Sequence, residues 1–229
     1  MIKTVVFDLD DTLYDEIDYC RSGFASVAEF LANLLKLPAH KTFNTLWRQF
    51  QAGNRRKTFN AALDELSIRY DDNLIQELIS VYCNHIPKIN LPDDSRDVLV
   101  ELSGKYTLAL LTDGYLPAQQ LKVQALGIEK YFKCIVYTEQ LGRNCWKPSP
   151  VGFEKLLKTL NISAETAAYV ADDEKKDFIG PNKLGIVTIQ IIRPARLHTE
   201  SAIKTDALAR YKIYKISELS DLLINIKSA

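Results

Sequence analysis

The sequence has no long hydrophobic run and no excess of either charge. No apolar stretch approaches the roughly 18 to 20 residues of a membrane-spanning helix, and Met1-Ile2-Lys3 leads straight into a short apolar run without the features of a signal peptide. We therefore expect a cytoplasmic protein with no membrane partner. Among the 229 residues, 29 Lys and Arg balance 29 Asp and Glu, so no overall field would recruit nucleic acid.

Cysteine is also scarce. The four cysteines are far apart and form no Cys-x-x-Cys pair, which argues against a zinc site and indicates reduced thiols. The sequence contains no internal repeat and no low-complexity tract. Its composition, 47% hydrophobic and 25% charged, is that of an ordinary globular protein. The chain is long enough for a domain with a full core and a smaller second unit.

Strands and helices alternate through most of the chain. Short apolar runs predict strands, and segments with helical spacing predict helices. We expect strands at residues 5–7, 106–111, 134–137, 167–171, 186–192 and 213–214. We expect helices at residues 93–102, 117–126, 150–160, 174–184 and 217–226. This alternation predicts an α/β fold with a doubly wound, mostly parallel, Rossmann-like sheet and helices on both faces.

Residues 14–87 interrupt the alternation. Apolar residues recur at helical spacing from Tyr14 to Leu37, and further helices are predicted at residues 39–51, 58–69 and 73–85. We expect residues 14–87 to form an all-helical domain inserted into an α/β core domain of residues 1–13 and 88–229. Residues 193–208 have the weakest pattern and are expected to be a loop or a short helix.

Polar residues follow the first two predicted strands of the core. Asp8 and Asp10 come directly after the first strand, and Thr112-Asp113-Gly114 follows the second. Ligands of open α/β sheets gather at the carboxyl ends of the strands. A hydroxyl beside exposed backbone N–H groups is a suitable lining for an anion. Each motif alone could also be a simple turn.

Charged residues occupy two later positions. Lys147 precedes a predicted helix, and Asp172, Asp173 and Asp177 follow the strand at residues 167–171. Adjacent carboxylates that leave a buried strand are costly unless a cation sits there, so they favour oxygen ligation of Mg²⁺. The alternative is that Asp172 or Asp173 caps the next helix.

Together these residues resemble the haloacid dehalogenase-like (HAD) hydrolase superfamily. The resemblance covers the whole chain, and residues 14–87 look like a helical cap of the C1 type. It is carried by the four motifs of that superfamily, matched here by Asp8-Leu9-Asp10-Asp11-Thr12, by Thr112, by Lys147, and by Asp172-Asp173 with Asp177. The resemblance implies a phosphatase with Mg²⁺ as cofactor. The acid at position 10 favours phosphoryl transfer over dehalogenation, which needs no acid for a halide leaving group.

The resemblance also implies roles for the acids. Asp8 would be nucleophile and metal ligand, carrying an aspartyl-phosphate. Asp10 would protonate the leaving group and deprotonate the water, contributing at most its backbone carbonyl to the metal. Asp172 would be a metal ligand, and either Asp173 or Asp177 the second acid there.

The phosphoryl group would be held by Thr112, by Lys147 and by the backbone N–H groups of Asp113 and Gly114. Among the predicted site residues, Lys147 is the only cation facing five carboxylates. We expect the metal-free site to repel a phosphate dianion for that reason.

Substrate choice is expected to rest with the cap. Tyr14, Arg21 and Trp47 are candidate specificity residues, and the basic run at residues 55–57 could contact a second anionic group or be a solvated loop. The expected substrate is a small phosphomonoester, such as a sugar phosphate or nucleoside monophosphate, for a monomer or weak homodimer. A sugar phosphomutase is one alternative, and a non-catalytic phosphate-binding or regulatory protein is another.

Overall fold

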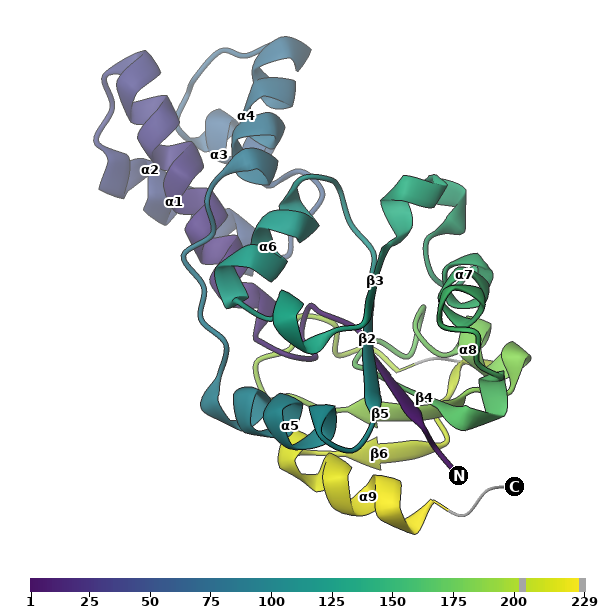
Figure 1. Ribbon diagram of the computed structural model, residues 1–229. Coiled ribbons are helices and arrows are strands. Elements are labelled where there is room, and N and C mark those ends of the chain that lie inside the picture. The colour runs from purple at the N-terminus through teal and green to yellow at the C-terminus, as the bar shows by residue number, and fades with distance from the viewer. Residues whose placement is uncertain (202–204, 227–229) are drawn as a thin grey trace.

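The computed structural model describes residues 1–201 and 205–226. In this part of the chain, six parallel strands form one sheet with the order β3-β2-β1-β4-β5-β6 (Figure 1). The strands are β1 (Thr4–Phe7), β2 (Thr107–Thr112), β3 (Cys134–Tyr137), β4 (Ala167–Ala171), β5 (Val187–Ile191) and β6 (Tyr211–Ile213). The predicted doubly wound α/β fold is confirmed, and the sheet places β1 between the strands that carry the second and fourth motifs.

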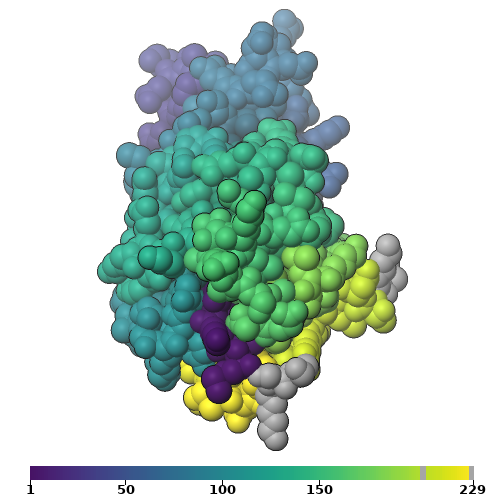
Figure 2. All heavy atoms as spheres, turned by 45° about the vertical axis from the view of Figure 1, so that its right-hand side comes forward, coloured from purple at the N-terminus to yellow at the C-terminus, as the bar shows by residue number. Residues whose placement is uncertain are grey.

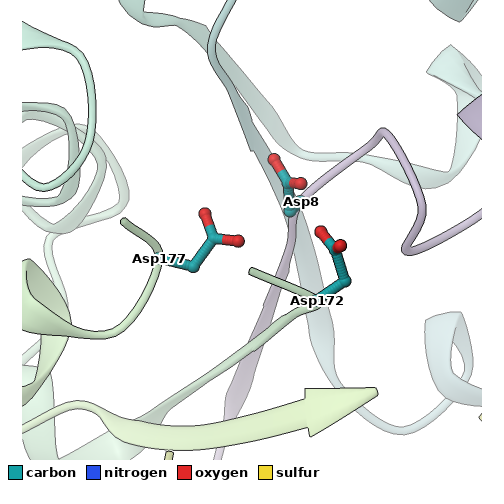
Figure 3. Close-up of side chains that lie close together, drawn as sticks. All are labelled: Asp8, Asp172 and Asp177. Carbon is teal, nitrogen blue, oxygen red and sulfur yellow. The ribbon is translucent and has the colours of Figure 1, made fainter. Parts of the chain in front are cut away.

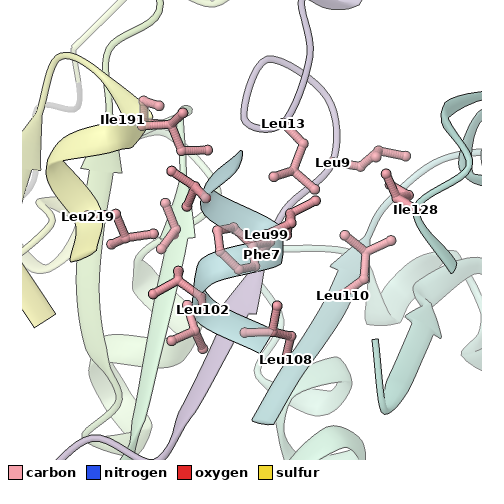
Figure 4. Close-up of a cluster of buried hydrophobic side chains, with 14 of the residues drawn as sticks. Phe7, Leu9, Leu13, Leu99, Leu102, Leu108, Leu110, Ile128, Ile191 and Leu219 are labelled. Atoms are coloured by element: carbon pink, nitrogen blue, oxygen red, sulfur yellow. The ribbon is translucent and has the colours of Figure 1, made fainter. Parts of the chain in front are cut away.

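Helices cover both faces of the sheet because alternate strand residues point to opposite faces. Val5 and Phe7 of β1 join one buried cluster, whereas Val6 joins the other. Figure 4 shows Phe7 within the first cluster, beside leucines of a helix and of β2. The core helices are α5 (Asp93–Ser103), α6 (Ala118–Leu126) and α9 (Leu219–Asn225) on the first face, and α7 (Val151–Leu160) and α8 (Ile179–Leu184) on the second.

Residues 16–84 contain helices and their connecting loops. The helices are α1 (Glu16–Leu35), α2 (Ala39–Gln51), α3 (Thr58–Glu65) and α4 (Asp72–Asn84). They enclose a third hydrophobic cluster with Phe24, Leu31 and Leu46 at its centre. In Figure 2 the purple and blue spheres of this insertion form a lobe at the top of the molecule, behind the teal and green core. The domain bounds at residues 14 and 87 stay a prediction.

Asp11 ties the insertion to the core. Its backbone is in the left-handed region, with φ of 54°, and its side chain is buried. The carboxylate accepts hydrogen bonds from the backbone N–H of Glu16, at the start of α1, and of Leu197, in the loop after β5. Leu197 in turn packs against the hydrophobic cluster of the insertion. An ion pair of 2.8 Å between Asp15 and Arg193 reinforces the same junction.

The fourth-motif helix begins later than predicted. It was expected from Glu174, but α8 starts at Ile179 because carboxylates hold the preceding residues in turns. The backbone N–H of Asp173 donates to the Asp177 carboxylate at 2.9 Å, and that of Lys175 donates to the Asp173 carboxylate at 2.9 Å. Capping of this helix by Asp172 or Asp173 is therefore wrong, and residue 178 holds the N-cap position without a side-chain bond.

Other boundaries differ by a few residues. The helix predicted at residues 58–69 ends at Glu65, and β6 ends one residue before the predicted Tyr214. Residues 202–204 of the predicted irregular segment and residues 227–229 lie outside the described residues. Within the described ranges, no helix is long and apolar enough to cross a membrane.

Candidate active site

Three carboxylates meet at the carboxyl ends of β1 and β4. Because these strands are paired, Asp8 and Asp172 leave the sheet side by side, and the turns after β4 bring Asp177 back toward them (Figure 3). One oxygen from each carboxylate lies within 4.8 Å of the others. All three residues are buried, with 3% or less of their surface exposed. Such crowding of like charges is unfavourable unless cations offset it.

Lys147 supplies one such cation. Its Nζ atom lies 2.7 Å from an oxygen of Asp8 and 2.7 Å from an oxygen of Asp177, and it donates to the Tyr169 hydroxyl at 3.0 Å. Burial raises the pKa of Asp8 to about 7. The positive charge of Lys147 acts to lower this pKa, but Lys147 also pairs with Asp177, so burial prevails. Burial acts the same way on Asp177, but Lys147 and Lys176 outweigh it and hold its pKa below the ordinary value.

No cation of the described residues forms an ion pair with Asp172. Burial, together with the charges of Asp177 and Asp8, raises its pKa to about 10. Its Oδ2 atom is buried and accepts no hydrogen bond from any residue in the described part of the chain. The ionised form therefore calls for a bound cation, and a hard ion such as Mg²⁺ prefers carboxylate oxygens of this kind. The residues present fit a magnesium site.

Asp173 faces elsewhere. Its carboxylate accepts from the Lys175 backbone, and one oxygen lies 3.9 Å from Nδ1 of His198. Of the two acids left open by the sequence, the structure brings Asp177 into the cluster with Asp8 and leaves Asp173 outside it. A metal-binding role for Asp177 remains a proposal.

Asp10 is held by three other side chains. Tyr14 donates its hydroxyl at 2.5 Å, Gln119 donates its amide at 2.8 Å, and the Lys122 ammonium lies 2.8 and 2.9 Å from the two carboxylate oxygens. Burial acts to raise the pKa of Asp10, but the charge and hydrogen bonds of these donors outweigh it and lower that pKa. Lys122 is itself buried, with Nζ 4.1 Å from the centre of the Tyr19 ring.

The expectation that Lys147 alone faces the acids is therefore wrong. Lys122 neutralises Asp10, and Lys176 acts electrostatically on Asp177. The sequence placed Gln119 and Lys122 on one face of a predicted helix, because residues three apart are helical neighbours. That spacing carries no information about which acid they meet.

The second motif lies beside the first because β2 pairs with β1. The Thr112 hydroxyl accepts a hydrogen bond of 2.8 Å from Gln119, so the same amide contacts both Thr112 and Asp10. Gly114 has φ of +137°, and a Cβ there would come within 2.9 Å of the Gln119 side chain. Glycine is thus required where the loop approaches this amide.

Asp113 positions the loop of the third motif. Its carboxylate accepts from the Thr138 hydroxyl at 2.6 Å and from the backbone N–H of Lys147 at 2.9 Å. The side chain therefore connects the second and third motifs.

The predicted specificity residues occupy different places. Tyr14 is buried against Asp10, as described above. Arg21 and Trp47 contact each other on the insertion, with the guanidinium carbon 5.1 Å from the indole centre. Arg55 and Arg56 line a cavity of about 310 Å³. Its aromatic walls are formed by Tyr115 of the core and by four residues of the insertion, Phe24, Phe50, Phe59 and Tyr82. This cavity adjoins the second motif, because Tyr115 follows Gly114.

Known proteins share this architecture over nearly their whole length. The chain is 28% identical to a glyceraldehyde 3-phosphate phosphatase of Methanocaldococcus jannaschii, covering 99% of both chains. It is 26% identical to a ribulose-1,5-bisphosphate 5-phosphatase of Halopiger xanaduensis, covering 97% of this chain and 100% of the relative. The magnesium-bound HAD-hydrolase YfnB of Bacillus subtilis superposes with a TM-score of 0.69 at 23% identity, covering 98% and 99% of the two chains. Residues 5–191 match the model of the haloacid dehalogenase-like hydrolases, and the chain belongs to that family.

Proposed function

We propose that the chain is a Mg²⁺-dependent phosphatase that hydrolyses a small sugar phosphate through an aspartyl-phosphate on Asp8. The observation that carries the proposal is the buried cluster of Asp8, Asp172 and Asp177 around the Lys147 ammonium. The names of the two phosphatase relatives support a sugar phosphate as substrate. Residues 14–87 would be a cap of the C1 type.

Asp8, Asp172 and Asp177 would hold the metal, with the backbone carbonyl of Asp10. Bound Mg²⁺ would supply positive charge that offsets the carboxylates and the phosphoryl oxygens. Lys147 favours the ionised form of Asp8 and would orient it toward the substrate through the 2.7 Å contact. An ionised, oriented carboxylate is the form needed for nucleophilic attack.

In the first half-reaction, an Asp8 oxygen bonds to phosphorus while the bond to the sugar oxygen breaks. Asp10 would give a proton to that oxygen as it leaves. Thr112, Lys147 and the N–H groups of Asp113 and Gly114 would hold the phosphoryl oxygens. In the second half-reaction, water attacks phosphorus, its proton passes to Asp10, and phosphate leaves Asp8.

A phosphate-release screen with Mg²⁺ tests this proposal. The panel should include glyceraldehyde 3-phosphate, ribulose 1,5-bisphosphate, hexose phosphates and nucleoside monophosphates. We expect release from at least one sugar phosphate, and loss of release in EDTA. Asp8→Asn should lower the rate at least roughly a thousandfold, about 4 kcal/mol of transition-state stabilisation.

Undiminished turnover in EDTA or by Asp8→Asn would overturn the mechanism. A sugar phosphomutase would instead isomerise the sugar phosphate without releasing phosphate. Tight binding without turnover of any substrate would favour the non-catalytic alternative.

A further inference from the structure

Both carboxylate oxygens of Asp10 accept hydrogen bonds from neighbouring side chains. One oxygen accepts from Tyr14 and Lys122, and the other accepts from Gln119 and Lys122. These four contacts fix both the location of the carboxylate and the direction of its plane. The donors come from the chain entering the insertion and from α6 of the core.

Every one of these contacts is made by a donor, and the Lys122 side chain is only 5% exposed. Removing one donor should therefore loosen the carboxylate that has to meet the water of the second half-reaction.

We infer that Lys122 and Tyr14, with Gln119, are positioning residues that hold Asp10 for the hydrolysis of the aspartyl-phosphate. In that step a water oxygen bonds to phosphorus, the bond from phosphorus to the Asp8 oxygen breaks, and the water proton passes to Asp10. The inference rests on the proposed function, since it requires the covalent intermediate.

The two half-reactions can be separated with p-nitrophenyl phosphate. Its leaving group needs no protonation, so formation of the aspartyl-phosphate does not depend on an acid. Replacing Lys122 by Met keeps the length of the side chain and removes its charge. We expect Lys122→Met to release nitrophenolate in a rapid burst of about one equivalent per active site, followed by slow turnover in which kcat and KM fall together, at least tenfold. Their ratio should change little.

Tyr14→Phe removes only one hydroxyl and provides a second variant in case Lys122→Met does not fold. It should show the same burst with a smaller loss of kcat, and Lys122→Arg should recover part of the rate. Lys105→Met is the matched control, because Lys105 is exposed and pairs with Glu101 away from the site. It should behave as the parent does.

A burst that is absent, or a fall in kcat/KM equal to the fall in kcat, would overturn the inference. So would unchanged kinetics in both Lys122→Met and Tyr14→Phe. These outcomes are distinct from failure of the proposed function, which would appear in the parent protein as turnover that does not require Asp8.

Discussion

At the residue scale, the three clustered acids are not equivalent. Lys147 contacts Asp8 and Asp177, whereas Asp172 has a buried oxygen that accepts no hydrogen bond from any described residue. In the metal-free protein the ionised form of Asp172 is therefore the most costly of the three. Burial without a protein donor makes the Asp172 carboxylate costly in free energy, and it also makes that carboxylate a good ligand for a cation.

Asp172→Asn should separate these two effects. We expect it to raise the Mg²⁺ concentration for half-maximal activity at least tenfold, about 1.4 kcal/mol, because a negatively charged ligand is lost. We also expect it to raise the melting temperature measured in EDTA near neutral pH, because Asn avoids the cost of either protonating or charging a buried carboxyl group.

Asp173→Asn provides the control. The Asp173 carboxylate lies outside the cluster and accepts from the Lys175 backbone. The Mg²⁺ concentration for half-maximal activity of Asp173→Asn should stay close to that of the parent. Equal shifts in the two variants would show that Asp173 also binds the metal.

At the element scale, α1 and α4 approach closely at Gly23. A Cβ on Gly23 would lie 2.4 Å from a ring carbon of Tyr82. That ring is itself packed against Tyr19 and Phe24, with ring centres 5.4 Å away in each case, so it has little room to retreat. The glycine is therefore required by packing.

We predict that Gly23→Ala lowers the free energy of unfolding by about 1–3 kcal/mol, the usual cost of overpacking. Urea denaturation followed by circular dichroism would measure it. Gly104→Ala is the matched control, because the nearest atom to its added Cβ is a carbonyl oxygen at 3.6 Å. A similar loss in both variants would contradict the packing argument.

The elements show where sequence patterns suffice. The strands at residues 134–137 and 167–171 have the predicted bounds, because each is a continuous apolar run, as is typical of strands in a parallel sheet. The start of α8 differs from the prediction because the Asp173 and Asp177 carboxylates accept backbone N–H groups and hold these residues in turns, which overrides helical spacing. Side-chain bonds to the backbone depend on the three-dimensional turn, which periodicity does not encode.

At the scale of the whole molecule, stability should depend on pH and Mg²⁺ together. The folded-state pKa values of Asp8 and Asp172 are raised to about 7 and about 10. The folded metal-free protein therefore binds more protons at these residues than the unfolded chain does. The contribution of these two residues to its stability should fall as the pH rises above about 4, the ordinary pKa of Asp, and be lost as the pH passes about 7 and about 10. Asp177, whose pKa is lowered, contributes no change between pH 6 and pH 8.

Bound Mg²⁺ would compete with those protons. We expect the rise in melting temperature on exchanging EDTA for Mg²⁺ to be larger at pH 8 than at pH 6. Thermal melting at the two pH values, with Asp172→Asn beside the parent, would measure this. An equal rise at both pH values would contradict a site that binds protons and metal in competition.

The whole molecule also explains which parts of the site were predictable. Asp8, Thr112 and Asp172 could be grouped from sequence because each follows a strand, and parallel strands end at one edge. Lys122 could not be assigned to Asp10, because their contact depends on how α6 packs beside β1 and on the path of the chain into the insertion. Such contacts follow from packing, which a single sequence does not specify.

The buried Asp11 has a practical consequence for protein engineering. Its carboxylate receives N–H groups from Glu16 and Leu197, so a segment far along the sequence belongs to the same junction as the first turn of α1. A chimaera that exchanged only residues 14–87 with those of a relative would separate Leu197 from the hydrophobic cluster it packs against. The smallest transplantable unit is therefore discontinuous, and consists of the helical insertion together with the loop after β5.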